Sequence, residues 1–125
     1  WSIYYNAHQF LAGGSDGGVG VFVRFGVSDG NPNAVHWNLA AGLGGSGLLP
    51  FGAGDRFGLG FFYLGMSDQD LLQGLGVDDE YGGELFYSFG VTPWLHLTAD
   101  AQVVKPALPV SDTAVVFALR ARLVL

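Results

Sequence analysis

The sequence has no cysteine, and only 13% of its 125 residues are charged. Disulfides and cysteine-ligated zinc or iron–sulfur sites are therefore excluded. Lys and Arg number 5 against 11 Asp and Glu, which gives a formal net charge of −6 at pH 7. So few cations cannot form a basic stripe along a phosphate backbone, so nucleic acid is excluded as a partner. A soluble domain usually carries about 25% charged residues, well above the content of this chain.

Motifs for catalysis and for metal binding are also missing. The sequence has no G-x-S-x-G nucleophile elbow, and its three histidines form no H-E-x-x-H pattern. The acidic residues between Ser67 and Glu80 lack the glycine spacing of an EF-hand loop. We therefore expect no enzyme activity, no cofactor and no metal site.

Apolar residues and glycine are abundant instead. Half of the chain is hydrophobic (50%), and 21 positions are glycine. This composition excludes intrinsic disorder, which requires low hydrophobicity and high charge. It also argues against a helix bundle, because each interior glycine costs a helix about 1 kcal/mol. The longest uncharged run, residues 30–54, is interrupted by glycine and Pro50, so it does not predict a transmembrane helix.

Apolar and polar residues alternate along most of the chain. Near the C-terminus every second side chain from Val115 is apolar, and Arg120 and Arg122 fall between them. Because successive side chains of a strand face opposite sides, this alternation predicts strands with one apolar face. Seven strands are predicted, over residues 1–11, 19–28, 35–44, 56–64, 84–91, 94–104 and 115–125. Turn-forming residues separate them at 13–18, 28–33, 45–55, 67–79, Thr92-Pro93 and 105–111.

Two architectures share this pattern, a soluble β-sandwich and a membrane β-barrel. In the sandwich the apolar face covers a core, whereas in the barrel it contacts lipid and the polar face lines a lumen. Most acidic residues fall in connections, and the exceptions Glu84 and Asp100 share the polar face with Arg24, Arg120 and Arg122. This placement favours the barrel, because an arginine at the lipid midplane costs about 2–4 kcal/mol. The expected fold is an all-β, antiparallel transmembrane barrel.

The number of strands indicates a larger barrel. Bacterial outer-membrane barrels have an even strand number, and an isolated seven-stranded sheet exposes two unpaired edges to lipid. We therefore expect residues 1–125 to be the C-terminal part of one barrel domain. If the last strand ends in the periplasm, Thr92-Pro93 is a periplasmic turn, and the 67–79 and 105–111 connections are external.

Several stretches resemble one known family. They are GGVGVFVRFGVSDGNPN (17–33), AAGLGGSGLLPFGAGDRFGLGFFYLG (40–65), ELFYSFGVTPWLHLTADAQVVKPAL (84–108) and DTAVVFALRARLVL (112–125). They are similar to the C-terminal third of the carbohydrate-selective porin family of the OprB type. The resemblance implies a sixteen-stranded outer-membrane barrel that passes glucose and other sugars by facilitated diffusion. Chains of this family usually end in Phe, the residue that the insertion machinery reads, whereas this sequence ends in Leu125.

Odd and even residue numbers of a strand face opposite sides, and this parity assigns candidate site residues to the polar face. Arg120 and Arg122 are the first candidates for contact with sugar, because guanidinium groups offer fixed donors to hydroxyls; the alternative is ionic pairing with Glu84 or Asp100. The predicted pore-lining set is Arg24, His36, Asn38, Glu84, His96, Asp100, Gln102, Arg120 and Arg122. Phe22 and Phe86 are predicted to pack against the barrel wall, with stacking on a sugar ring as the alternative. The predicted membrane-interface aromatics are Trp37, Tyr81, Tyr87 and Trp94.

The expected location is the outer membrane of a Gram-negative bacterium. The expected partners are small sugars, outer-membrane lipid, the barrel-insertion machinery and, as an open alternative, further copies of the chain. Two other functional classes stay open, a non-transporting barrel that anchors or exports and a soluble sandwich that binds a ligand.

Overall fold

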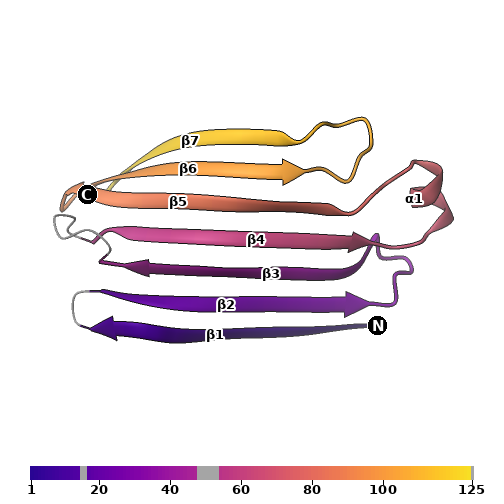
Figure 1. The fold of residues 1–125 in the computed structure, drawn as a ribbon, viewed down its shortest axis with the longest axis horizontal. Coiled ribbons are helices and arrows are strands. Elements are labelled where there is room, and N and C mark those ends of the chain that lie inside the picture. The colour runs from indigo at the N-terminus through magenta and orange to yellow at the C-terminus, as the bar shows by residue number, and fades with distance from the viewer. Residues whose placement is uncertain (15–16, 48–53, 125) are drawn as a thin grey trace.

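Seven strands form one antiparallel sheet in which strand order follows chain order (Figure 1). The structure, a computed structural model, describes residues 1–14, 17–47 and 54–124. Within these residues the all-β prediction of seven strands is confirmed. The strands are β1 (Ser2–Gly14), β2 (Gly17–Ser28), β3 (Val35–Ser46), β4 (Arg56–Met66), β5 (Glu80–Thr92), β6 (Leu95–Lys105) and β7 (Ala114–Leu123).

The ends of two predicted elements differ from the sequence-based boundaries. Strand β5 begins at Glu80 rather than Glu84, because the residues from Glu80 pair with β4, while the adjacent Gly82 and Gly83 hide the alternation. Thr92 pairs with Leu95, so the tight turn is formed by residues 93–94 rather than by Thr92-Pro93. The 67–79 connection contains a short helix, α1 (Asp70–Gly74), that the sequence did not predict. Predicted turn positions 15–16 and 48–53, and Leu125, lie outside the described residues.

The strands are long enough to cross a bilayer. They contain between 10 and 13 residues. At a rise of about 3.4 Å per residue and a tilt of about 40°, such strands span an apolar band about 25 Å tall. Among the residues that the structure describes, no helix is both long and apolar enough to cross a membrane.

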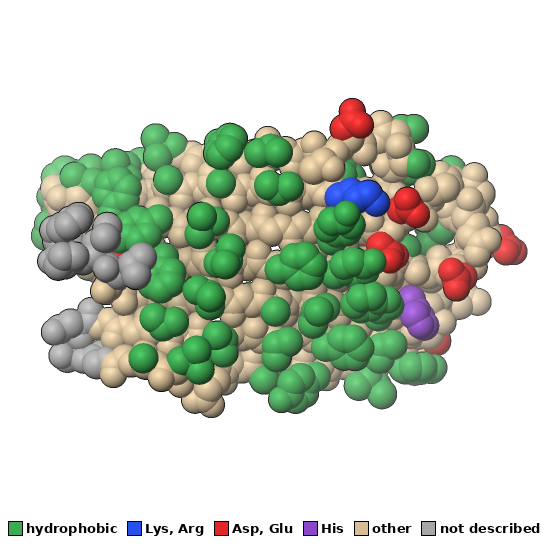
Figure 2. All heavy atoms as spheres, in the orientation of Figure 1, with side chains coloured by type: hydrophobic (Ala, Val, Ile, Leu, Met, Phe, Trp, Pro, Cys, Tyr) green, Lys and Arg blue, Asp and Glu red, His purple; other side chains and the backbone are tan. Residues whose placement is uncertain are grey.

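The sheet is a single layer without a hydrophobic core. Within the described ranges, Ala107 is the one buried apolar residue, at 9% exposure, whereas Phe10, Phe117 and Leu119 are each more than three-quarters exposed. Figure 2 shows one face of this layer, on which hydrophobic side chains spread over the strands and acidic side chains gather at the end that carries α1. A sandwich requires a second layer over the apolar face, and none is found in the described part of the chain.

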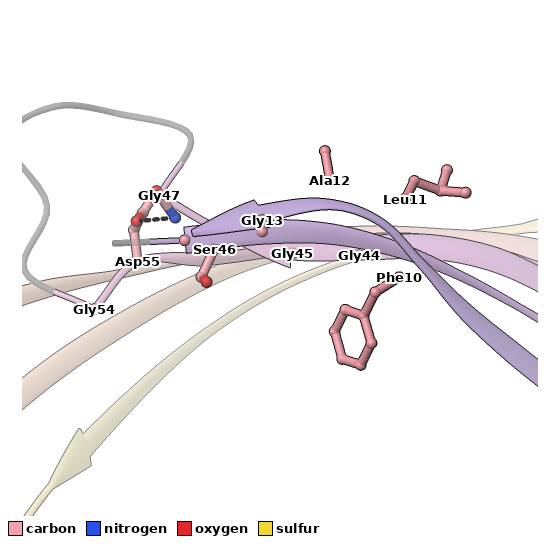
Figure 3. Close-up of a pocket in the computed structure, with 12 residues that line it drawn as sticks. Phe10, Leu11, Ala12, Gly13, Gly44, Gly45, Ser46, Gly47, Gly54 and Asp55 are labelled. Carbon is pink, nitrogen blue, oxygen red and sulfur yellow. Dashed lines mark hydrogen bonds between the residues drawn. The ribbon is translucent and has the colours of Figure 1, made fainter. Parts of the chain in front are cut away.

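Three register shifts interrupt the alternation in the described strands. They lie between Phe10 and Ala12 on β1, between Val35 and Trp37 on β3, and between Gly90 and Thr92 on β5. At the first bulge, Phe10 points to one side of the sheet while Leu11 and Ala12 point to the other (Figure 3). The predicted shared face for Ile3, Tyr5, Ala7 and Leu11 is confirmed. The first three pair with apolar residues of β2, and Leu11 points to the same side as Ala12, which pairs with Val19 beyond the bulge (Figure 3).

Glycine permits close backbone approach between β2 and β3, which gives a testable stability difference. A Cβ atom added at Gly45 would overlap the main-chain oxygen of Gly18, whereas one added at Gly60 would have no heavy atom within 4 Å. We expect Gly45→Ala to lower the free energy of unfolding by about 1–3 kcal/mol, because the backbone must shift to admit the methyl group. Gly60→Ala is the matched control and should retain wild-type stability. Urea unfolding in lipid vesicles measures both, and equal stability of the two variants would contradict the close approach of β2 to β3.

Candidate functional site: a polar groove on one face of the sheet

Cross-strand pairing brings polar residues of four strands onto one face. Arg120 on β7 lies opposite Thr98 on β6, Thr98 lies opposite Ser88 on β5, and Ser88 lies opposite Arg56 on β4. In the neighbouring rows, His96 is the partner of Arg122. Because paired residues of adjacent strands share a face, one polar surface extends across β4 to β7.

These residues line a groove with a volume of about 550 Å³. The Thr98 hydroxyl donates a hydrogen bond to the Ser88 hydroxyl oxygen over 2.9 Å. Asp100 Oδ1 is buried and has no hydrogen-bond partner in the described part of the chain. The charged and polar side chains that line the groove are Arg56, Glu84, Ser88, His96, Thr98, Asp100, Arg120 and Arg122. The groove thus presents donors and acceptors along one wall.

Arg120 and Arg122 are exposed at the edge of this groove. Pairing with Glu84 or Asp100 was the alternative role for them. Among the described residues, no ion pair within 4.0 Å involves either arginine. Their guanidinium groups are therefore accessible to a solute in the groove, and each offers several donors in a fixed fork.

Three other predicted residues lie on the same face outside the groove. Arg24 is opposite Ala40, and Gln102 is opposite Glu84. Asn38 is opposite Gly26, and its amide nitrogen lies 2.7 Å from the position that a Cβ of Gly26 would occupy. The face therefore continues from the groove towards β2.

His36 departs from the predicted alternation. It lies within the bulge between Val35 and Trp37, so it has no cross-strand partner in the β3–β4 register. The pairing therefore does not assign it to the face that carries Asn38. Its ring nitrogen Nδ1 is 3.1 Å from the position that a Cβ of Gly30 would take, beside the connection between β2 and β3. A bulge adds one residue to a strand, which is why counting every second residue fails there.

Three charged or polar groove residues were missing from the predicted set, namely Arg56, Ser88 and Thr98. Arg56 is the first residue of β4, where the sequence alternation is weak. The available signal was its even residue number, which it shares with Gly58 and Gly60 on the same strand. Ser88 and Thr98 share the parity of Glu84 and Asp100, but their small hydroxyl side chains give only a weak sequence signal.

An aromatic stack crosses the apolar face at the end of the sheet that carries α1. Trp37 stacks on Tyr63 with ring centroids 4.8 Å apart, and Tyr63 stacks on Tyr81 at 5.8 Å. The Lys105 ammonium group lies 5.5 Å from the Tyr81 ring centroid. The Tyr63 hydroxyl donates a hydrogen bond to Asp79 over 2.6 Å. Amphipathic rings with polar ends are typical of the membrane–water interface, and Tyr63 was not among the predicted aromatics.

Aromatic residues also lie near the opposite end of the sheet. Tyr87 stacks with Phe89 at a centroid distance of 6.4 Å, and Trp94 is 52% exposed in the turn between β5 and β6. The Tyr87 hydroxyl donates to Asp55 over 2.5 Å, and the Gly47 main-chain N–H donates to the same carboxylate over 2.8 Å. Figure 3 shows the second of these bonds. Asp55 is thus held between Gly47, directly after β3, and Tyr87 on β5.

A one-layer antiparallel sheet with an apolar face, aromatic side chains towards both ends and a polar groove on the other face is the arrangement expected for the wall of a β-barrel membrane channel. The family comparison agrees with this class. The chain belongs to the carbohydrate-selective porin, OprB family, whose model matches residues 1–125. This is an outer-membrane channel family rather than an enzyme family. No curated protein and no solved structure was found to match the chain.

Proposed function

We propose that the chain forms part of the wall of a water-filled channel through which glucose and other small sugars diffuse passively across the outer membrane of a Gram-negative bacterium. The polar groove of about 550 Å³ on the face opposite the lipid-compatible surface carries this proposal. The family, described as carbohydrate-selective, supplies the class of solute.

The groove offers the hydrogen bonds that a sugar loses when it leaves bulk water. Arg120 and Arg122 donate, Glu84 and Asp100 accept when ionised, and the hydroxyl of Thr98 does both. A sugar hydroxyl is also both a donor and an acceptor, so this mixture of groups replaces its water contacts at little cost. Selective passage requires contacts that are favourable on entry and weak enough to permit exit.

The edges of the sheet support placement within a larger barrel. In the described residues β1 and β7 each pair with one strand only. An unpaired edge in hydrocarbon leaves backbone N–H and C=O groups unsatisfied at a cost of several kcal/mol each. We therefore propose that residues 1–125 are the C-terminal part of one barrel domain, for which the resemblance to the family implies sixteen strands.

The orientation and the partners follow from the same proposal. The end that carries α1 faces outwards, because it has the longer connections and the gathered acidic side chains (Figure 2), and outer loops of such barrels are longer than periplasmic turns. The apolar face contacts outer-membrane lipid, and the barrel-insertion machinery places the chain there. Association with further copies of the chain remains the open alternative to a single barrel.

Liposome swelling with the native porin tests the proposed transport. We expect faster swelling in glucose than in triglycine, a non-sugar of similar size. Replacing both Arg120 and Arg122 by Gln should slow glucose entry about two- to tenfold for each hydrogen bond lost, since one such bond is worth about 0.5–1.5 kcal/mol. Lys105→Gln, which removes a cation from the opposite face, is the control and should leave the rate unchanged. Absence of sugar-dependent swelling would refute transport and favour the non-transporting barrel.

A further inference from the structure

Two phenyl rings lie across glycines of neighbouring strands on the face that bears the polar groove. A Cβ atom at Gly42 on β3 would be 2.7 Å from Cε1 of Phe22 on β2, and a Cβ at Gly58 on β4 would overlap the ring of Phe86 on β5. The rings occupy the space that side chains at these positions would take. They therefore lie against the sheet instead of projecting away from it.

One glycine beside the two covered ones is open. Gly42 pairs with Gly60, and Gly44 pairs with Gly58, so the four glycines form two adjacent pairs across β3 and β4. No heavy atom lies within 4 Å of a Cβ built on Gly60. The open position adjoins a cavity of about 310 Å³, which we call the aromatic slot. Six of its lining residues carry the argument, namely Phe22, Gly44, Gly58, Gly60, Glu84 and Phe86.

Charged groups border the aromatic slot at two sides. Glu84 is exposed and lies directly opposite Gly60 in the β4–β5 register. The guanidinium carbon of Arg24 lies 5.8 Å from the centroid of the Phe22 ring. An apolar surface is thus flanked by an acceptor and by a group of donors. Pockets that bind small molecules commonly combine an apolar lining with a few placed polar groups.

We propose that the aromatic slot is a binding subsite for the pyranose ring of a sugar in transit. A pyranose has a face of C–H groups and a rim of hydroxyls, so its face packs on Phe22 and Phe86 while its rim bonds to Glu84 and Arg24. The C–H groups of the pyranose carry partial positive charge, which the negative face of a phenyl ring attracts. The inference rests on the proposed sugar transport and adds to it an aromatic subsite, which shares Glu84 and Phe86 with the polar groove and is not lined by Arg120 or Arg122.

Alanine variants in the native porin test this subsite. Sugar-induced reduction of ion current in planar bilayers gives the affinity for glucose. We expect Phe22→Ala and Phe86→Ala each to weaken glucose binding about two- to tenfold, the range for one aromatic contact. Phe62→Ala is the matched control, because Phe62 lies over Gly82 in the same way but does not line the slot. Unchanged affinity in both slot variants, or an equal loss in Phe62→Ala, would overturn the proposal.

Filling the slot provides a second, independent variant. Gly60→Leu places a side chain into open space, so the barrel should fold as the wild type does, while glucose binding falls at least as far as in Phe86→Ala. Sorbitol, which has the hydroxyls of a sugar but no ring, should bind the wild type more weakly than glucose and should bind Phe86→Ala and wild type equally. If glucose permeates the wild type but Gly60→Leu binds it normally, the slot proposal fails and the proposed transport stands. If glucose neither binds nor permeates the wild type, both fail.

Discussion

Replacing Leu119 by Arg is expected to lower the free energy of unfolding in lipid by about 2–4 kcal/mol, or about 30- to 700-fold in the folding equilibrium. Leu119 lies near the middle of β7, is 77% exposed, and pairs with Ala99 on the apolar face. A guanidinium group at this position must enter hydrocarbon or distort the bilayer to reach water. Urea titration of the folded, vesicle-inserted protein measures the loss.

Ala118→Arg is the control for this large effect. Ala118 is the preceding residue on the same strand, lies on the opposite face, and pairs with Asp100. An arginine there stays in the aqueous lumen beside a carboxylate, and opposite charges paired across strands contribute roughly 0.2–1 kcal/mol. We therefore expect stability at or slightly above wild type. An equal loss in the two variants would contradict the assignment of the faces.

Asp55→Ala is expected to lower the free energy of unfolding by about 3 kcal/mol or more, because two hydrogen bonds to a charged acceptor are lost. Asp55 is 1% exposed and accepts from the Gly47 N–H and from the Tyr87 hydroxyl. Its removal leaves the Gly47 N–H and the Tyr87 hydroxyl without this acceptor, beside the first residue of β4. The denaturant midpoint in vesicles is the measurement.

Graded replacements separate the two bonds of Asp55. Asp55→Asn retains one oxygen acceptor and should lose less stability than Asp55→Ala. Tyr87→Phe removes one bond only and should cost about 1.5–3 kcal/mol. Phe89→Leu, which alters the ring beside Tyr87 but no hydrogen bond, is the control for aromatic packing. A Tyr87→Phe variant as stable as wild type would show that Asp55 is held by its other contacts alone.

The arrangement of faces could be predicted from sequence because a strand has a period of two. Val115 to Leu123 alternate without a break, and β7 follows the prediction. The positions at which this period is broken could not be predicted. The bulges at Leu11 and His36 each add one residue, and which residue of a strand is bulged depends on the partner strand. Helix α1 was missed because its five residues are too few to show a helical period.

The candidate site was predictable to the extent that parity determines it. Arg120, Arg122, His96, Glu84 and Asp100 line one groove, as their shared parity implied. The pairing of Phe22 with Gly42, and of Phe86 with Gly58, could not be read from the sequence. It depends on the register between strands, which local alternation leaves open. Packing on the wall was the predicted role of both rings, and the structure adds the glycines beneath them.

Strand order in this sheet equals chain order, with each strand paired to its predecessor. Every new strand therefore finds its pairing edge in the segment synthesised just before it, and loop closure costs little when the partner is close in sequence. Assembly can advance one hairpin at a time without rearranging strands that are already paired. For the same reason, duplication or loss of a hairpin would change the circumference of a barrel in steps of two strands and leave the remaining pairings intact.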